Sequence, residues 1–460
     1  MKRSFLIRAA TAMAVAVCPA AAMTIPAVSA AATTTAITLK PAAGPPTTTV
    51  TVDGTGFGPA ETVTVDFDTT PAATATTSAA GSFTAPLKVP AAALPGQHTV
   101  TATGQASSLS ANAPFLVRTN WPKFRFNNGN SGFNRYENVL SPATVGGLTK
   151  AWSHSLRNRI FSSPAVVGGV IYVGSSARRL YALKASTGAM LWSYFTGADV
   201  SSPAVANGVV YEGGYALNAS TGAMLWNFPG ADTQSTPAVV NGVVYMGSYN
   251  GFYALNAATG AQLWSYQPGD FSFDSSPAVV NGVVYVGCAD GKVYALNAAT
   301  GAKLWSYQTG DVVYSSPAVV NGVVYVGSSD SNVYALNAAT GAKLWSYATG
   351  NLNEVSSSPA VANGVVYVGS YSDDVYALNA ATGAKLWSYA TGERISSSPA
   401  VANGVVYVGS YDHKVYALNA ATGAKLWSYA TGGDVPSSPA VANGAVYVGS
   451  EDANLYKFHL

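Results

Sequence analysis

Hydrophobic and polar positions alternate in short runs separated by glycines from about residue 121 to the end of the chain. In one unit the runs are "SSPAVV", "GVVYVGS", "NVYALNA" and "AKLWSYAT". Alternation at a period of two over such short runs predicts β-strands. Asn321-Gly322, between the first two runs, is a strong hairpin signal, and Ala339-Thr340-Gly341 turns between the last two. Each unit therefore predicts four antiparallel strands.

The unit repeats along the chain. Tryptophans recur at spacings of 34 to 42 residues, and Ser-Ser-Pro-Ala or a close variant begins at Ser162, Ser201, Ser235, Ser275, Ser315, Ser357, Ser397 and Ser437. Repeated four-stranded units of this length predict an all-β protein with an eight-bladed β-propeller. The density of Val, Tyr and Thr excludes a helical solenoid. A β-helix is the alternative, although its repeats are usually shorter.

The two ends of the repeat region complement each other. The last unit, from Ser437, stops without a tryptophan strand, whereas "AWSHSL" around Trp152 precedes the first Ser-Ser-Pro. We expect this N-terminal strand to complete the last blade, because that pairing leaves no open sheet edge.

Residues 31–118 have a different composition, rich in Thr and Ala. Runs such as "TTTVTVDGTGF" and "GQHTVTATG" alternate between Gly and Pro turns, which predicts a small antiparallel sandwich. The stretch, with Gly54–Pro59 and Gly81–Pro90, resembles the immunoglobulin-like modules of bacterial surface proteins, which implies a spacer or adhesive role. A lead-in segment (residues 119–149) and the propeller (150–460) follow.

Residues 1–30 have the features of a secretory signal peptide. Lys2, Arg3 and Arg8 precede an apolar stretch, and Val28-Ser29-Ala30 offers a cleavage site. The alternative, a membrane anchor, needs a longer apolar run. We therefore expect a secreted or cell-surface protein. Cys18 sits in a poor lipidation context, and Cys288 is then the only cysteine of the mature chain; serines at the same place in sister repeats predict a small buried residue.

The repeated stretch "ALNAATGAKLW" resembles the tryptophan-docking motif of the pyrroloquinoline-quinone (PQQ) propeller superfamily. "VYVGSSDSNVYALNAATG" is similar to the companion half of that repeat, and residues 121–152 resemble the lead-in of such proteins. This superfamily contains quinoprotein dehydrogenases and outer-membrane assembly propellers. One departure recurs, because Asn297, Asn337, Asn379 and Asn419 stand where the family has Asp.

The motif also has a physical interpretation without a cofactor. A tryptophan on each fourth strand can wedge between neighbouring blades while its N–H reaches a carbonyl. Burial of about 150–250 Å² per ring at about 25 cal/mol/Å² stabilises by at most about 4–6 kcal/mol. We therefore expect packing roles for Trp152, Trp192, Trp226, Trp264, Trp305, Trp345, Trp387 and Trp427.

Strand alternation places the constant Asn-Gly and Ala-Thr-Gly turns on one face and the variable connections on the other. Because functional residues concentrate on the loops of rigid scaffolds, this varied face is the candidate binding face. It carries sixteen acidic against seven basic residues, which suits calcium or a basic partner, unless the acids only solvate turns. Its candidate residues are Arg178, Arg179, Glu212, Asp270, Asp274, Asp290, Asp311, Asp330, Glu354, Asp373, Asp374, Glu393, Arg394, Asp412, His413, Asp434, Glu451 and Asp452.

Two local features modify the varied face. The second unit runs "VVYEGGYALNASTG" and is five residues short, which predicts a shallow groove beside Glu212. Exposed loop aromatics suitable for stacking on sugars are expected at Tyr249, Phe271, Phe273, Tyr314, Tyr371 and Tyr411. Packing within the loops is the alternative role for these rings.

Three function classes remain. A net charge of +2 without a basic run argues against nucleic-acid binding. The resemblance implies either a non-catalytic binding or scaffolding propeller, or a dehydrogenase holding PQQ over calcium. The dehydrogenases usually have an adjacent Cys-Cys pair and longer excursions between blades, which this chain lacks. We therefore expect no cofactor, no catalytic residue and a monomer that binds a protein or glycan; carbohydrate binding is the third class.

Overall fold

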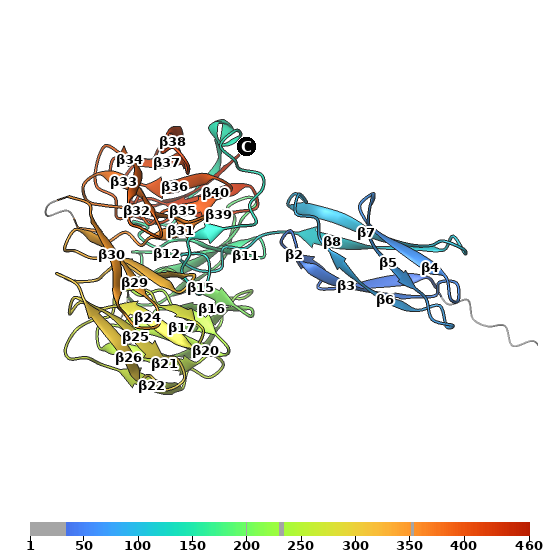
Figure 1. The fold of residues 1–460 in the computed structure, drawn as a ribbon, viewed down its shortest axis with the longest axis horizontal. Coiled ribbons are helices and arrows are strands. Elements are labelled where there is room, and N and C mark those ends of the chain that lie inside the picture. The colour runs from blue at the N-terminus through green and yellow to red at the C-terminus, as the bar shows by residue number, and fades with distance from the viewer. Residues whose placement is uncertain (1–33, 199, 230–233, 351–353) are drawn as a thin grey trace, which may run out of the picture.

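The computed structural model describes residues 34–198, 200–229, 234–350 and 354–460. Figure 1 shows a β-sandwich, in blue, joined to a ring of sheets coloured green to red. Across these residues the one helical element is a 3-10 turn, η1 (Val145–Gly147), and no helix is long and apolar enough to cross a membrane. The expected signal peptide and Cys18 lie outside the described residues.

The N-terminal domain is a sandwich of two sheets, as expected. Val50, Val52 and Leu87 from one sheet and Phe115 from the other are fully buried in its core, and their neighbours along each strand face outward. One sheet contains β1 (Ala36–Lys40), β3 (Thr49–Thr55) and β6 (Phe83–Lys88); the other contains β2 (Ala43–Gly44), β8 (Ser110–Val117), β7 (Gly96–Gly104), β4 (Thr62–Phe67) and β5 (Thr70–Thr76).

The repeats form successive four-stranded antiparallel sheets of a propeller. The sheets follow the repeats in order: β11 (Ala165–Val167), β12 (Val170–Ser175), β13 (Arg179–Lys184) and β14 (Met190–Phe195); β15 (Ala204–Ala206), β16 (Val209–Glu212), β17 (Tyr215–Asn218) and β18 (Met224–Asn227); β19 (Ala238–Val240), β20 (Val243–Ser248), β21 (Gly251–Asn256) and β22 (Gln262–Tyr266); β23 (Ala278–Val280), β24 (Val283–Gly287), β25 (Lys292–Asn297) and β26 (Lys303–Gln308); β27 (Ala318–Val320), β28 (Val323–Gly327), β29 (Asn332–Asn337) and β30 (Lys343–Ala348); β31 (Ala360–Ala362), β32 (Val365–Gly369), β33 (Asp374–Asn379) and β34 (Lys385–Ala390); β35 (Ala400–Ala402), β36 (Val405–Gly409), β37 (Lys414–Asn419) and β38 (Lys425–Ala430). The final sheet combines β39 (Ala440–Ala442), β40 (Ala445–Gly449) and β41 (Asn454–His459) with β10 (Thr149–Ser155).

The pairing of β10 with β41 confirms the predicted closure by the N-terminal strand. The two strands run antiparallel, with Trp152 opposite Lys457. A strand that follows the sandwich therefore completes the sheet that ends the chain, and the outer edge of β41 is covered.

The turns inside a repeat adopt the geometry that their residues favour. Asn321 and Gly322 have φ of +51° and +78°, the left-handed pair that a two-residue type I′ hairpin requires. At the other turn, Asn337 Oδ1 accepts the N–H groups of Ala339 and Thr340 at 2.9 and 3.0 Å. This turn needs only an oxygen acceptor, which asparagine supplies as well as aspartate does, so the Asn substitution retains the turn.

Each motif tryptophan joins its sheet to the next one. Trp345 Nε1 donates to the carbonyl of Ala380 at 3.0 Å. Its ring packs against Gly383 of the next sheet, where an added Cβ would lie only 2.8 Å from Trp345 Cδ2. The predicted wedge is therefore confirmed. The equivalent donors are Trp152 to Ala185, Trp192 to Ala219, Trp226 to Ala257, Trp264 to Ala298, Trp305 to Ala338, Trp387 to Ala420 and Trp427 to Leu148.

The lead-in segment has a role that the sequence did not indicate. It runs along the innermost strands of the propeller and bonds to them one after another. Trp121 bridges Val166 of β11, and β9 (Phe133–Asn134) adds to the inner edge of β35. Backbone carbonyls of the lead-in segment also accept the backbone N–H groups of inner strands, in the pairs Pro122 with Val205, Asn128 with Val279, Gly129 with Val319, Ser131 with Val361 and Gly132 with Val401. The side-chain amides of Asn128 and Asn134 donate to the carbonyls of Val239 and Val441.

Two cations of the lead-in segment are buried inside the ring. The Arg125 guanidinium donates to the carbonyls of Pro359 and Pro399, while Lys123 Nζ donates to Asn130 Oδ1 at 2.6 Å. Asn130 in turn donates to carbonyl oxygens of two further repeats. Burial lowers the pKa of Lys123 to about 7 and that of Arg125 to about 9. The prolines of Ser-Ser-Pro therefore supply acceptors for a segment that fills the channel.

Candidate functional site

A basin of about 660 Å³ opens on the varied face, above the segment that fills the channel. The second serine of most Ser-Ser-Pro motifs lines it, together with Phe124 of the lead-in segment. The other side chains that matter chemically are Phe161, Gln234, Tyr249, Asp274, Tyr314, Glu354 and Tyr371. The volume falls within the range of small-molecule pockets.

The serines of the wall are connected from sheet to sheet. The N–H of Ser316 donates to Ser358 Oγ at 2.9 Å, and that of Ser358 donates to Ser398 Oγ at 2.9 Å. Because each hydroxyl oxygen accepts an N–H, its own proton stays available for another acceptor. The same bond joins Ser163 to Ser202, Thr236 to Ser276, Ser276 to Ser316 and Ser398 to Ser438.

The first serine of the motif has a structural role. Ser315 Oγ donates to the carbonyl of Ser357 and accepts the N–H of Gly327. Its donor and an acceptor site are both used inside the ring. Only the second serine of each pair therefore contributes to the basin.

Asp274 and Glu354 are the predicted acids that line the basin. Asp274 Oδ2 accepts from Ser272 Oγ at 2.8 Å, and its half-buried position raises its pKa. Asp274 Oδ1 and Ser356 Oγ are buried without a partner among the described residues. An unsatisfied buried polar atom costs about 1–3 kcal/mol, so a rotation that turned either side chain toward a ligand in the basin would gain a hydrogen bond.

Four other predicted acids hold the loops around them through hydrogen bonds. Asp330 Oδ2 accepts from Tyr334 Oη and from the N–H of Gly310, both at 2.6 Å. The same tyrosine bond recurs from Tyr294 to Asp290, from Tyr416 to Asp412 and from Tyr456 to Asp452. These hydrogen bonds help to lower the pKa of Asp290, Asp412 and Asp452 against the effect of burial. The structure thus gives these carboxylates a structural role.

The remaining charged candidates lie around the basin in pairs or alone. Glu451 pairs with Arg159 at 3.4 Å, and His413 pairs with Asp434 at 3.0 Å. The Arg394 guanidinium lies 4.2 Å from the Tyr411 ring centre and 5.4 Å from that of Tyr371, a cation–π arrangement.

No other predicted charge enters the basin. Arg179 donates to Ser193 Oγ, and Asp311 accepts the N–H of Val312. Asp373 and Asp374 are half-buried, whereas Arg178, Asp270 and Glu393 are exposed. Across residues 34–460, apart from the three gaps, no group of three or more His, Cys, Asp or Glu side chains is placed to hold a metal ion.

A side pocket lies near the short second repeat, although Glu212 does not line it. Gly213 and Gly214 join β16 to β17, with Glu212 opposite Tyr215, and the side pocket, of about 350 Å³, lies along Ser201 and Ser202. Glu212 is buried behind it and accepts the Ser201 N–H at 2.9 Å. Burial raises the pKa of Glu212 to about 7. The side pocket shares Phe161, Ser202 and Gln234 with the basin, so the two hollows adjoin.

The expectation for one loop aromatic was wrong. Phe273 is fully buried among Phe252, Tyr266 and Tyr294, because its backbone N–H bonds to Ser248 and turns the ring inward. Phe271 is exposed outside the basin. Phe161 and Phe124 were not predicted. Phe161 directly precedes the first Ser-Ser-Pro, just as Gln234, Asp274 and Tyr314 precede the equivalent motifs, so the alignment of the repeats could have identified it. Phe124 has no equivalent in the repeats.

Cys288 is buried and free of a disulfide. Its N–H bonds to Lys292 O as that of Ser328 bonds to Asn332 O, and burial raises its thiol pKa to about 12. The prediction of a buried small residue is confirmed.

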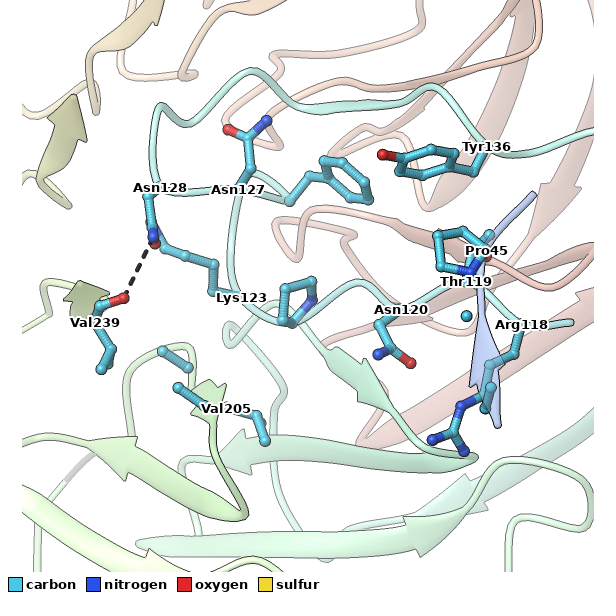
Figure 2. A pocket seen from close by; sticks show the side chains of 16 residues that line it. Pro45, Arg118, Thr119, Asn120, Lys123, Asn127, Asn128, Tyr136, Val205 and Val239 are labelled. Atoms are coloured by element: carbon cyan, nitrogen blue, oxygen red, sulfur yellow. Dashed lines mark hydrogen bonds between the residues drawn. The ribbon is translucent and has the colours of Figure 1, made fainter. Parts of the chain in front are cut away.

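A second cavity, of about 560 Å³, lies where the sandwich meets the propeller on the opposite face (Figure 2). Pro45 and Arg118 stand on one side of it, and Val205 and Val239 on the other. The Asn128 side chain crosses to the Val239 carbonyl at 3.3 Å. Its lining contains Arg118 and Lys123 and no carboxylate, so its charge is opposite to that of the basin.

Comparison with protein families gives two matches. The family described as outer membrane protein assembly factor BamB matches residues 146–267, 252–394 and 372–459, and the macroglobulin-like domain family matches residues 32–117. The family match to the repeats spans more than half of the chain. A search of curated protein sequences gives no match.

Solved structures with the same fold are distant in sequence. A europium-containing methanol dehydrogenase is 16% identical with a TM-score of 0.64, covering 74% of this chain and 98% of that one. BamB from Moraxella catarrhalis is 22% identical with a TM-score of 0.58, covering 68% and 98%. A quinohemoprotein alcohol dehydrogenase from Comamonas testosteroni is 18% identical with a TM-score of 0.62, covering 74% and 80%.

Proposed function

Because the chain belongs to the BamB family of PQQ-type propellers, we propose that it is a non-catalytic binding protein that engages its ligand through the basin of the varied face. The observation that carries this proposal is the basin itself, a concave opening of about 660 Å³ lined by serine hydroxyls, two carboxylates and aromatic rings. The proposal includes an eight-bladed, monomeric propeller that is secreted or held at the cell surface.

The residues of the basin do not fit PQQ. The cofactor carries three carboxylates, whereas the described lining offers Asp274 and Glu354 and no Lys, Arg or His. Like charges in a partly buried site repel strongly. A calcium ion that would offset the repulsion lacks a cluster of acidic ligands among the described residues. The only described cysteine, Cys288, has no neighbour with which to form a vicinal disulfide. We derive no redox step for this protein.

Calorimetry with PQQ, with and without calcium, tests the non-catalytic part of the proposal. We expect no saturable heat at micromolar protein and no alcohol-dependent reduction of an artificial electron acceptor. Saturable binding together with such reduction would overturn the proposal and support a dehydrogenase.

A parallel experiment tests the binding face. An array of glycans and peptides is probed with the wild-type protein, with Tyr314→Ala in the basin and with Arg118→Ala in the cavity of Figure 2. The proposal requires signals that are lost with the first variant and retained with the second. Signals that depend only on Arg118, or no signal at all, contradict it.

A further inference from the structure

The chemistry of the basin indicates which class of ligand it takes. Its side chains fall into three kinds: hydroxyl donors in the wall, carboxylate and amide groups, and aromatic rings. We infer that the basin binds a neutral oligosaccharide, with sugar hydroxyls on the serine and carboxylate wall and a sugar face on the tyrosines. This inference rests on the proposed function, since it names the ligand of the same site.

The serine wall presents donors. Ser358 and Ser398 accept the N–H of the preceding repeat, so their hydroxyl protons are directed to another acceptor. A ligand that offers only donors, such as a lysine or arginine side chain, would leave these protons without acceptors. The wall therefore favours a ligand with acceptor oxygens.

The opposite requirement comes from the two acids. Ionised Asp274 and Glu354 only accept hydrogen bonds, and Asp274 Oδ1 has no partner. A ligand with acceptors alone, such as a polycarboxylate or phosphate, would meet these groups with like charge. Sugar hydroxyls are both donors and acceptors, so a neutral carbohydrate satisfies both parts of the wall.

Aromatic rings supply the apolar part of the surface. Phe161, Tyr249 and Tyr314 line the basin and remain 47%, 43% and 44% exposed. Gln234 Nε2 donates to Tyr249 Oη at 3.1 Å, which helps to fix that ring. The rings present flat apolar faces beside polar groups, and the C–H faces of a pyranose can stack on them.

The rings and the acids surround one space. Asp274, Glu354 and Tyr314 line the same basin, and the two acids raise the pKa of Tyr314 after the larger effect of burial. A ligand stacked on Tyr314 therefore occupies the space that both carboxylates border. The adjoining side pocket at Ser202 and Gln234 gives room for a further unit of an oligosaccharide.

Isothermal titration calorimetry with cellotetraose, chitotetraose and mannotetraose tests the inference. We expect saturable binding of at least one of them, weakened at least tenfold by Tyr314→Ala and by Asp274→Asn. Phe271→Ala is the matched control, because Phe271 is 47% exposed and lies in the same connection as Asp274 but outside the basin. This variant should bind as the wild type does. Unchanged thermal melting of each variant shows that folding is retained.

Two further probes separate this inference from the proposed function. Tetragalacturonate, which is acidic, should bind at least tenfold more weakly than the neutral sugars. An octalysine peptide is the alternative: if it binds in a Tyr314-dependent manner and no neutral sugar does, the carbohydrate inference is wrong and the binding function of the basin stands. If neither sugars nor peptide bind, or if all variants bind alike, the inference is overturned.

Discussion

The backbone N–H of Ser438 donates to the hydroxyl oxygen of Ser163 at 3.0 Å, across 275 positions of the chain. Ser437 Oγ makes the neighbouring bond to the Ser162 carbonyl at 2.9 Å. These are the contacts that successive repeats make elsewhere at separations of about 40 residues. The last repeat therefore contacts the first as any repeat contacts the next, and the wall of the basin continues across this junction.

The tryptophan wedge predicts a large loss of stability on truncation. Trp345 is 8% exposed and bonds to the next sheet, so Trp345→Ala should lower the free energy of unfolding by about 3–5 kcal/mol. Urea denaturation followed by circular dichroism measures the change. Leu344→Ala, at an exposed neighbouring position of the same strand, should change stability by less than about 0.5 kcal/mol; equal effects would refute the wedge.

Two glycines separate backbone strain from contact with the indole ring. Gly383 and Gly364 have φ of +74° and +80°, so alanine is strained at both. An added Cβ at Gly383 would lie 2.8 Å from Trp345, whereas at Gly364 it would meet nothing within 4 Å. Gly383→Ala should therefore cost about 1–3 kcal/mol more than Gly364→Ala. Similar midpoints in urea for the two variants would contradict the contact.

The buried Lys123 predicts a rise of stability at alkaline pH. Its pKa is about 7 in the folded protein and ordinarily 10.5, so the unfolded chain binds more protons between these values and stability increases with pH there. Lys123→Met should remove this slope, while Lys303→Met on an exposed outer strand should keep it. Urea unfolding at several pH values from 7 to 8.5 compares the three proteins below the folded pKa of Arg125, which is about 9. The prediction fails if Lys123→Met retains the wild-type slope.

The buried Glu212 predicts that stability decreases as the pH rises from acid toward neutral. Its folded pKa of about 7 lies above the ordinary 4.5, so the folded state holds the extra proton and stability falls as pH rises through this window. Glu212→Gln should be more stable than the wild type at pH 8 and equally stable at pH 4. Thermal melting at the two pH values measures this, with exposed Glu393→Gln as the control. A variant less stable than the wild type at pH 8 would show that the charged form of Glu212 is favoured.

The repeats made most of the fold predictable from the sequence. Any strand or turn that recurs is confirmed by its sister units, so Asn321-Gly322, the tryptophans and the closing strand at Trp152 were all placed correctly. The lead-in segment occurs once and lacks periodicity. Its buried Lys123 and Arg125 look like ordinary surface charges, because only the three-dimensional ring supplies the carbonyls that bond Arg125.

The candidate site was predictable as a face but not as a set of residues. Of the acids on the varied face, Asp274 and Glu354 line the basin, while Asp330 and its three equivalents bond to a tyrosine four residues later. This Asp-x-x-x-Tyr spacing is visible in the sequence and would have identified the structural set. The position directly before each Ser-Ser-Pro supplies Gln234, Asp274 and Tyr314 to the basin, and it would have identified Phe161 in the same way. Nothing in the repeats marks Phe124, whose position depends on how the lead-in segment enters the ring.

The path of the lead-in segment limits how many repeats the chain can contain. Nearly identical repeats invite duplication or deletion of a unit during DNA replication. The segment reaches each inner strand in turn, from Val166 to Val441, and its length is fixed. A gained unit would leave one inner strand without its contact, and a lost unit would leave surplus backbone groups unbonded. Because the segment has a fixed length, we expect chains with one repeat more or fewer to be less stable.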